Sequence, residues 1–154
     1  NVSTVLEKMI KETFDESYIA VVQGNREVNS QLLDLKFDTI FFTGSPSLGR
    51  TVMTAAAKNL TPVNLELGGK SPCIIDETAN IELAARRISW GKTLNSGQTC
   101  IAPDYVLIHK SLTEEFVKRF KTNLTKMHGE NVQNSSNYVR MVNAKEFNRV
   151  SSYL

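Results

Sequence analysis

The chain has 154 residues, a length typical of one globular domain. Hydrophobic residues make up 41% and charged residues 22%, a balance that excludes a disordered or collagen-like chain. The 18 Lys and Arg residues against 16 Asp and Glu give a net charge of +2, which argues against a nucleic-acid-binding protein.

Helical and strand-like patterns alternate along the chain. Apolar residues spaced three and four apart predict helices over 3–14, 26–36, 48–60, 80–94 and 143–154, with another that begins at 111. Short apolar runs predict buried strands over 19–22, 39–43, 63–67, 73–75 and 105–108. We expect Ser3 or Thr4 to cap the first helix, and Ser111 with Glu114 to form a capping box. This alternation predicts an α/β fold with a mostly parallel sheet, whose functional loops follow the carboxyl ends of the strands.

Cysteine usage favours a reducing compartment. The chain has only two cysteines, Cys73 and Cys100, and two histidines. They are too few and too widely spaced for a disulfide framework or a zinc site.

No apolar run approaches the length of a membrane span, so membrane attachment is not visible in this segment. The chain begins with Asn1 rather than Met and shows no signal peptide, which suggests an excised or incomplete stretch.

Residues 41–50 (FFTGSPSLGR) lead from a predicted strand into a predicted helix through Gly44. Backbone N–H groups and the positive end of the helix dipole would face an anion there, such as a pyrophosphate. Ser45 can donate to a phosphate oxygen, and Gly49 lets a ligand or a strand approach the helix closely. The spacing is not the usual G-x-G-x-x-G, and an ordinary capped strand-to-helix turn is the alternative interpretation.

Glu66, within LELGGK, is a lone carboxylate in an apolar strand. Burial in such a strand would make it a useful general base near neutral pH. Gly68 and Gly69 beside it would leave room for a substrate or cofactor. The alternative is an edge-strand Glu66 that faces water and pairs with Lys70.

Cys100 follows a turn of small residues, 95–99 (NSGQT), at the end of a predicted helix, where its thiol would be exposed. A nucleophilic Cys needs a stabilised thiolate and an oxyanion donor, and its own backbone N–H can serve as that donor. A buried structural Cys is the alternative for this segment. Cys73, which follows Pro72 inside an apolar strand, is interpreted as structural.

The three motifs FTGS, LELGGK and GQTC, in this order, resemble those of the aldehyde dehydrogenase superfamily. The separation of 34 residues between Glu66 and Cys100 also matches the family pattern. The phrases closest to the class 3, fatty-aldehyde branch are 53–58 (MTAAAK), 69–73 (GKSPC) and 95–105 (NSGQTCIAPDY). The resemblance covers essentially the whole chain. It implies part of a Rossmann-like NAD(P)-binding domain over residues 1–69 and the start of the catalytic domain over 70–154.

The resemblance also implies residue roles. Cys100 would attack an aldehyde to form a thiohemiacetal, which loses a hydride to NAD or NADP and becomes a thioester. Glu66 would activate the water that releases the carboxylic acid, and its presence favours hydrolysis over transfer to coenzyme A. Pro46 departs from the commoner Ser- or Thr-containing phosphate turns. The implied cofactor-binding residues are Gly44, Ser45, Gly49, Leu67 and Gly68.

Several properties of the whole enzyme follow from the same resemblance. We expect the substrate to be a medium- or long-chain aliphatic aldehyde or an aromatic aldehyde. We expect the complete protein to be a homodimer, located in the cytoplasm or on the cytosolic face of an intracellular membrane. The family's oxyanion Asn, ribose-binding Lys and Glu-Ile-Phe-Gly-Pro segment do not occur, so the 154 residues alone are expected to be inactive. The alternatives are a truncated, non-catalytic binding or interaction piece, and a Cys-dependent hydrolase, against which the turn at 44–49 argues.

Overall fold

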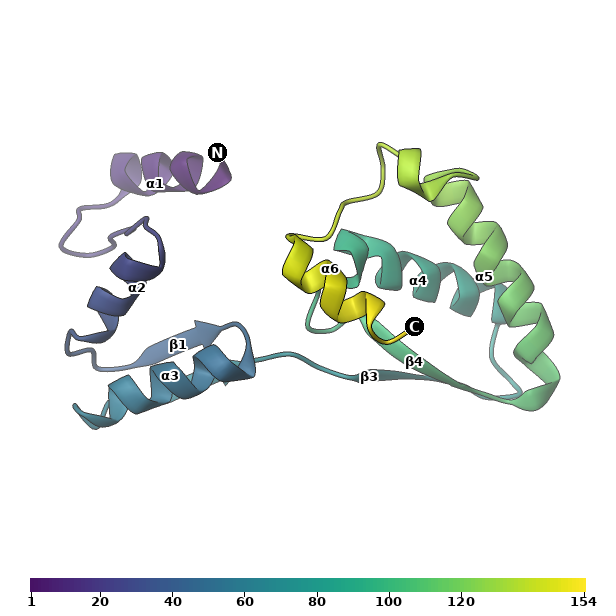
Figure 1. The fold of residues 1–154 in the computed structure, drawn as a ribbon, viewed down its shortest axis with the longest axis horizontal. Helices are drawn as coiled ribbons and strands as arrows, with labels where there is room; N and C mark the ends of the chain where they lie inside the picture. Colours follow the sequence, from purple (N-terminus) through teal and green to yellow (C-terminus); the bar gives the residue numbers. More distant parts are fainter. The chain divides into compact units, whose positions relative to one another are not determined.

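The computed structural model describes all 154 residues, which divide into two compact units, Asn1–Glu66 and Leu67–Leu154. Each unit contains two parallel strands with a helix between them in the chain (Figure 1). Parallel strands need such a crossover because the chain must return to the same end of the sheet. The α/β fold expected from the alternation of patterns is therefore confirmed.

In the first unit, helix α3 lies along a two-stranded sheet formed by β1 and β2 (Figure 1). The register sets Ile40 opposite Val63 and Thr43 opposite Glu66. The face of α3 that packs inward buries Gly49, Val52 and Ala56. The elements of this unit are α1 (Val2–Thr13), α2 (Arg26–Leu33), β1 (Ile40–Thr43), α3 (Pro46–Ala57) and β2 (Val63–Glu66).

The predicted strand at 19–22 is wrong, because the structure assigns no strand to this run. Ile19 and Val22 are exposed, and an extended segment becomes a strand only when a neighbour completes its hydrogen bonds. The predicted cap of α1 is also wrong: the helix begins at Val2, after Asn1, without a side-chain cap.

In the second unit, the core forms where α4 and α5 pack on the sheet of β3 and β4. Ile75, Ala85 and Phe116 are buried there, and burial of a ring such as that of Phe116 stabilises the fold by about 2 kcal/mol. The elements of this unit are β3 (Ser71–Ile75), α4 (Ile81–Thr93), η1 (Leu94–Gly97), β4 (Pro103–Ile108), η2 (Lys110–Leu112), α5 (Thr113–His128), η3 (Val132–Asn134) and α6 (Ala144–Ser151).

The predicted capping box at 111–114 is wrong. A short 3₁₀ turn, η2, precedes α5 and places Ser111 before the capping position, which Leu112 occupies. The Ser111 hydroxyl instead bonds Nδ1 of His109 at 2.8 Å. None of the helices is both long and apolar enough for a bilayer crossing.

Candidate active site

The turn between β1 and α3 is built around Gly44. Its backbone N–H donates to the carbonyl of Glu66 at 3.0 Å, which extends the pairing of β1 with β2. A Cβ at this position would lie 2.5 Å from the ring of Phe42, so glycine fits where a larger residue would force the ring to move. Ser45 then caps α3, its Oγ accepting from the Leu48 N–H at 3.3 Å. Pro46 takes the first helical position, where a missing N–H removes no hydrogen bond.

Fewer backbone donors are free at this turn than the sequence predicts. The Leu48 N–H is bound by the Ser45 hydroxyl, and the Gly49 N–H donates to the Ser45 carbonyl at 2.9 Å. The exposed hydroxyls of Ser45 and Ser47 are hydrogen-bonded to each other at 2.9 Å, so one of their two O–H groups is still available, together with the Ser47 N–H. One N–H and one hydroxyl at the positive end of a helix can bind a phosphate group. Gly49 is buried, which fits close packing of α3 on its strands.

Glu66 is the last residue of β2, and its side chain is exposed. Along this strand Val63 and Leu65 are half-buried, whereas Asn64 and Glu66 alternate to the open face. The predicted burial of the carboxylate among apolar neighbours is therefore not seen in this chain. The exposure agrees with the alternative interpretation, in which Glu66 faces water, and Lys70 forms an ion pair with Asp104 at 3.4 Å. Glu66 has no ion pair, and its carboxylate is free to bind water.

Cys100 is exposed in the turn that joins η1 to β4, as predicted for a reactive thiol and unlike a buried structural Cys. The residues Asn95, Ser96 and Gly97 before it have φ angles of 51°, 56° and 75°. This left-handed conformation costs a non-glycine residue of order 1 kcal/mol. Three such residues in succession reverse the chain after α4 and deliver Cys100 to the surface.

Gly69 is the residue whose backbone lies against Cys100. A Cβ built on Gly69 would lie 2.5 Å from the carbonyl oxygen of Cys100. By contrast, a Cβ on Gly68 would meet nothing within 4 Å. The packing around Cys100 therefore requires glycine at position 69 but not at position 68.

Gly69→Ala in the complete protein should lower the free energy of unfolding by about 1–3 kcal/mol, because backbone must move to relieve the clash. Gly68→Ala is the matched control and should change it by less than about 0.5 kcal/mol. Urea unfolding followed by circular dichroism measures both. Equal unfolding midpoints for the two variants would contradict the close approach.

Charged side chains around the turn form a cluster that the sequence patterns did not reveal. Asp104 pairs with Lys70 at 3.4 Å and with Lys92 at 4.0 Å. The Lys92 ammonium also lies 3.8 Å from the position that a Cβ on Gly97 would occupy. These residues come from three separate stretches of sequence, so no periodicity links them. The available signal was a Lys in the last turn of α4 and an Asp at the start of β4.

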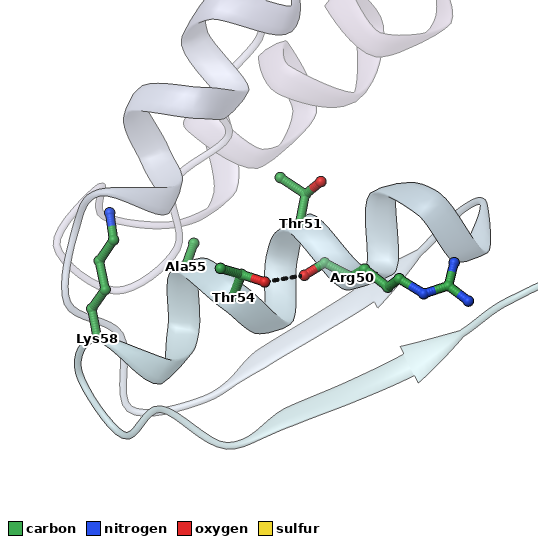
Figure 2. Close-up of a pocket in the computed structure, with 5 residues that line it drawn as sticks. All are labelled: Arg50, Thr51, Thr54, Ala55 and Lys58. Atoms are coloured by element: carbon green, nitrogen blue, oxygen red, sulfur yellow. Dashed lines mark hydrogen bonds between the residues drawn. The ribbon is translucent and has the colours of Figure 1, made fainter.

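Two shallow grooves lie apart from these residues, and neither is lined by Cys100, Glu66 or Gly44. One runs along α3 (Figure 2), where Arg50 and Lys58 project toward opposite ends of the helix and Thr54 donates to the Arg50 carbonyl at 2.9 Å. Its polar groups do not converge on one point, so it does not define a binding site. The other lies over the core of the second unit and is lined by Ile88, Lys92, Pro103, Asp104, Val106, Phe116 and Phe120.

The predicted site residues fall into two groups, one in each unit. Gly44 and Glu66 are joined by a backbone hydrogen bond, with Ser45 and Gly49 at the start of α3. The second group consists of Leu67, Gly68 and Cys100, with Gly69 against the Cys100 carbonyl. Within each unit, residues distant in sequence are therefore brought together.

Comparison with known proteins gives the class of protein that this fold and these motifs define. A profile described as the Aldehyde dehydrogenase family matches residues 1–154. The chain is 48% identical over all its 154 residues to 4,4'-diaponeurosporen-aldehyde dehydrogenase of Staphylococcus aureus, covering 34% of that protein. It is 45% identical over the same residues to aldehyde dehydrogenase family 3 member A2 of Pongo abelii, covering 32%.

Solved structures agree with the sequence matches. A substrate-bound Staphylococcus aureus AldH has a TM-score of 0.84 and 47% identity, over 99% of this chain and 33% of that one. An NAD-dependent aldehyde dehydrogenase from Sinorhizobium meliloti has a TM-score of 0.85 and 27% identity, over 99% and 31%. The chain belongs to the aldehyde dehydrogenase family, and its relatives include family 3 members, as the motifs predicted. It spans about a third of the length of the curated relatives it matches.

Proposed function

We propose that the complete protein oxidises aldehydes to carboxylic acids with a nicotinamide cofactor, and that Cys100 is its nucleophile. The observation that carries this proposal is the exposed thiol of Cys100 at the end of a left-handed turn, within a chain of the aldehyde dehydrogenase family. The backbone N–H of Cys100 has no acceptor in the chain, so it is available to bind an oxyanion.

The first half of the reaction takes place at Cys100. Its thiolate adds to the aldehyde carbon, a C–S bond forms, and the carbonyl oxygen becomes an oxyanion that accepts from the Cys100 N–H. The nicotinamide cofactor supplies the acceptor for the hydride that then leaves this carbon. Loss of the hydride re-forms the C=O bond, and the substrate is now held as a thioester on Cys100.

The second half uses Glu66. Its carboxylate takes a proton from a water molecule, and the resulting hydroxide adds to the thioester carbon. The C–S bond breaks, the carboxylic acid leaves, and the Cys100 thiolate is regenerated. The support for this role is a carboxylate at the end of β2 that has no ion pair and is open to water.

Residues at the start of α3 are proposed to hold the pyrophosphate of NAD or NADP. Gly44 forms the turn that leads into the helix, the Ser47 N–H and the hydroxyl pair of Ser45 and Ser47 offer donors at its positive end, and buried Gly49 lets the helix pack closely. Leu67 and Gly68 are proposed to line the nicotinamide end of the site. On this proposal residues 1–69 belong to the cofactor domain and residues 70–154 to the catalytic domain.

The substrate is proposed to be a medium- or long-chain aliphatic or an aromatic aldehyde. A relative named for 4,4'-diaponeurosporen-aldehyde and relatives in family 3 support this class. The free thiols of Cys73 and Cys100 support a reducing location, in the cytoplasm or on the cytosolic face of a membrane. A homodimer of the complete protein, and inactivity of the 154 residues alone, stay predictions.

The experiment that tests the function is reduced-cofactor formation by the complete protein. Absorbance at the reduced nicotinamide band would be followed with short, aromatic and long-chain aldehydes, each with NAD and with NADP. The proposal expects turnover that depends on both aldehyde and cofactor, with the matching acid as product. Absence of reduced cofactor with every aldehyde would overturn it.

A further inference from the structure

The side chain of Gln98 connects the turn before Cys100 to a distant segment of the chain. Its Nε2 donates to the Asn95 carbonyl at 2.9 Å and to the Arg140 carbonyl at 3.2 Å. Its Oε1 accepts from the Val142 N–H at 2.9 Å. Both N–H groups and the oxygen of the carboxamide are thus used, and two of the three bonds cross to residues more than forty positions later in sequence.

A third bond, from a different side chain, joins the same two segments, and residues 139–142 are themselves anchored. The Ser96 hydroxyl donates to the Val139 carbonyl. Arg140 donates through its guanidinium to the carbonyls of Val132 and Gln133, in the turn that follows α5. The segment between α5 and α6 therefore returns to the end of α4 (Figure 1), held by α5, which packs on the core of this unit.

We propose that Gln98 is a positioning residue for Cys100, which sets the orientation of the thiol and of its backbone N–H by holding the left-handed turn against residues 139–142. This inference rests on the proposed function of Cys100. It assigns a role to a residue that does not itself touch substrate.

The physical argument is that few other bonds hold the turn, among them the backbone bond from the Gln98 N–H to the Asn95 carbonyl at 3.1 Å. Asn95 and Ser96 occupy a conformation that a non-glycine residue leaves when it is not restrained. Within the turn, the further side-chain restraint is the bond from Asn95 Nδ2 to the Gln98 carbonyl at 3.2 Å. Only Thr99 separates Gln98 from Cys100, so relaxation at 95–98 is passed directly to the peptide whose N–H would bind the oxyanion.

Two substitutions separate hydrogen bonding from charge. Gln98→Met keeps the length of the side chain and removes all three bonds without adding charge. Gln98→Glu keeps the acceptor for Val142 and sets a carboxylate oxygen against two carbonyl oxygens. Gln31→Met is the matched control, because Gln31 is exposed on α2 and its side chain has no hydrogen bond in the chain.

The test has two readouts in the complete protein. The first is the rate of Cys100 alkylation by iodoacetamide from pH 6 to 10, followed by peptide mass spectrometry. The second is the rate of the pre-steady-state burst of reduced cofactor together with KM. We expect Gln98→Met and Gln98→Glu both to slow the burst about tenfold or more, to change the alkylation pH profile, and to leave KM within about twofold. Gln31→Met should match the wild type.

Some outcomes would overturn the proposal. The first is a slow burst in Gln98→Glu with a wild-type burst in Gln98→Met, because the added charge would then explain the effect. The second is a lowered melting temperature in Gln98→Met with a wild-type burst and a wild-type alkylation rate, because the role of Gln98 would then be structural only. If neither Gln98 variant folds, Ser96→Ala removes the bond to the Val139 carbonyl and must also slow the burst, and a wild-type burst in that variant refutes the proposal. If the wild type reduces no cofactor, the proposed function fails, and the alkylation profiles still decide the role of Gln98.

Discussion

Cys100→Ala in the complete protein should abolish aldehyde oxidation, with reduced-cofactor formation falling below detection. Without the sulfur no thiohemiacetal forms, and the substrate carbon cannot become the tetrahedral species from which a hydride leaves. The variant should still fold, because Cys100 is exposed and truncation of an exposed side chain changes stability by less than about 0.5 kcal/mol. Stopped-flow absorbance with a saturating aldehyde measures the effect.

Cys73→Ala is the control for that experiment. Cys73 lies half-buried in β3, and its loss should cost about 1 kcal/mol of folding stability while turnover is retained. Reduced cofactor produced by Cys100→Ala at a wild-type rate would refute the nucleophile assignment. Loss of turnover in both variants would point to misfolding and would be recognised by their circular dichroism spectra.

Glu66→Gln should separate the two halves of the reaction. The carboxamide cannot accept a proton from water, so hydrolysis of the thioester should slow by about 10²–10⁴-fold. Acylation does not need this base, and a burst of reduced cofactor equal to the enzyme concentration should therefore precede a very slow steady state. Rapid-quench and stopped-flow measurements resolve the two phases, and intact-mass spectrometry detects the accumulated acyl-enzyme.

Glu130→Gln is the matched control for charge, because Glu130 is exposed and makes no hydrogen bond or ion pair in the chain. It should leave both phases unchanged. A wild-type steady-state rate and a normal burst in Glu66→Gln would count against the base role. An equal loss in both phases would instead indicate that Glu66 acts before the thioester forms.

Much of the fold could be predicted from local sequence patterns. Helix positions followed from apolar spacing, because the faces of α3, α4 and α5 pack inward on sheets within the chain. The failures share a different cause. Ile19 to Val22 has the composition of a strand, yet strand formation depends on a partner, and the chain supplies none. Ser111 has the spacing of a cap, yet a 3₁₀ turn that the pattern does not encode shifted the helix start.

The features of the candidate site that depend on local motifs could be predicted from the sequence. The features that depend on contacts between distant parts of the chain could not. The exposure of Cys100 followed from the small residues before it. The exposed Glu66 carboxylate matches only the alternative interpretation of its segment, because the strand alternates and Glu66 lies on its open face. The bonds from Gln98 to residues 140 and 142 join positions that only the tertiary fold brings together. The requirement for glycine at 69 likewise depends on a backbone thirty-one residues away.

Two-stranded sheets have a practical consequence for anyone who prepares this stretch of chain. Each pair of strands leaves its outer N–H and C=O groups without a neighbour, and the residues beside them include Phe41, Ile74 and Leu107, which are 67%, 77% and 55% exposed. Open edges flanked by apolar side chains recruit further strands from other molecules. Recombinant material limited to these 154 residues should therefore precipitate as its concentration rises, and a lysine in place of Ile74 is the first change to make for soluble expression.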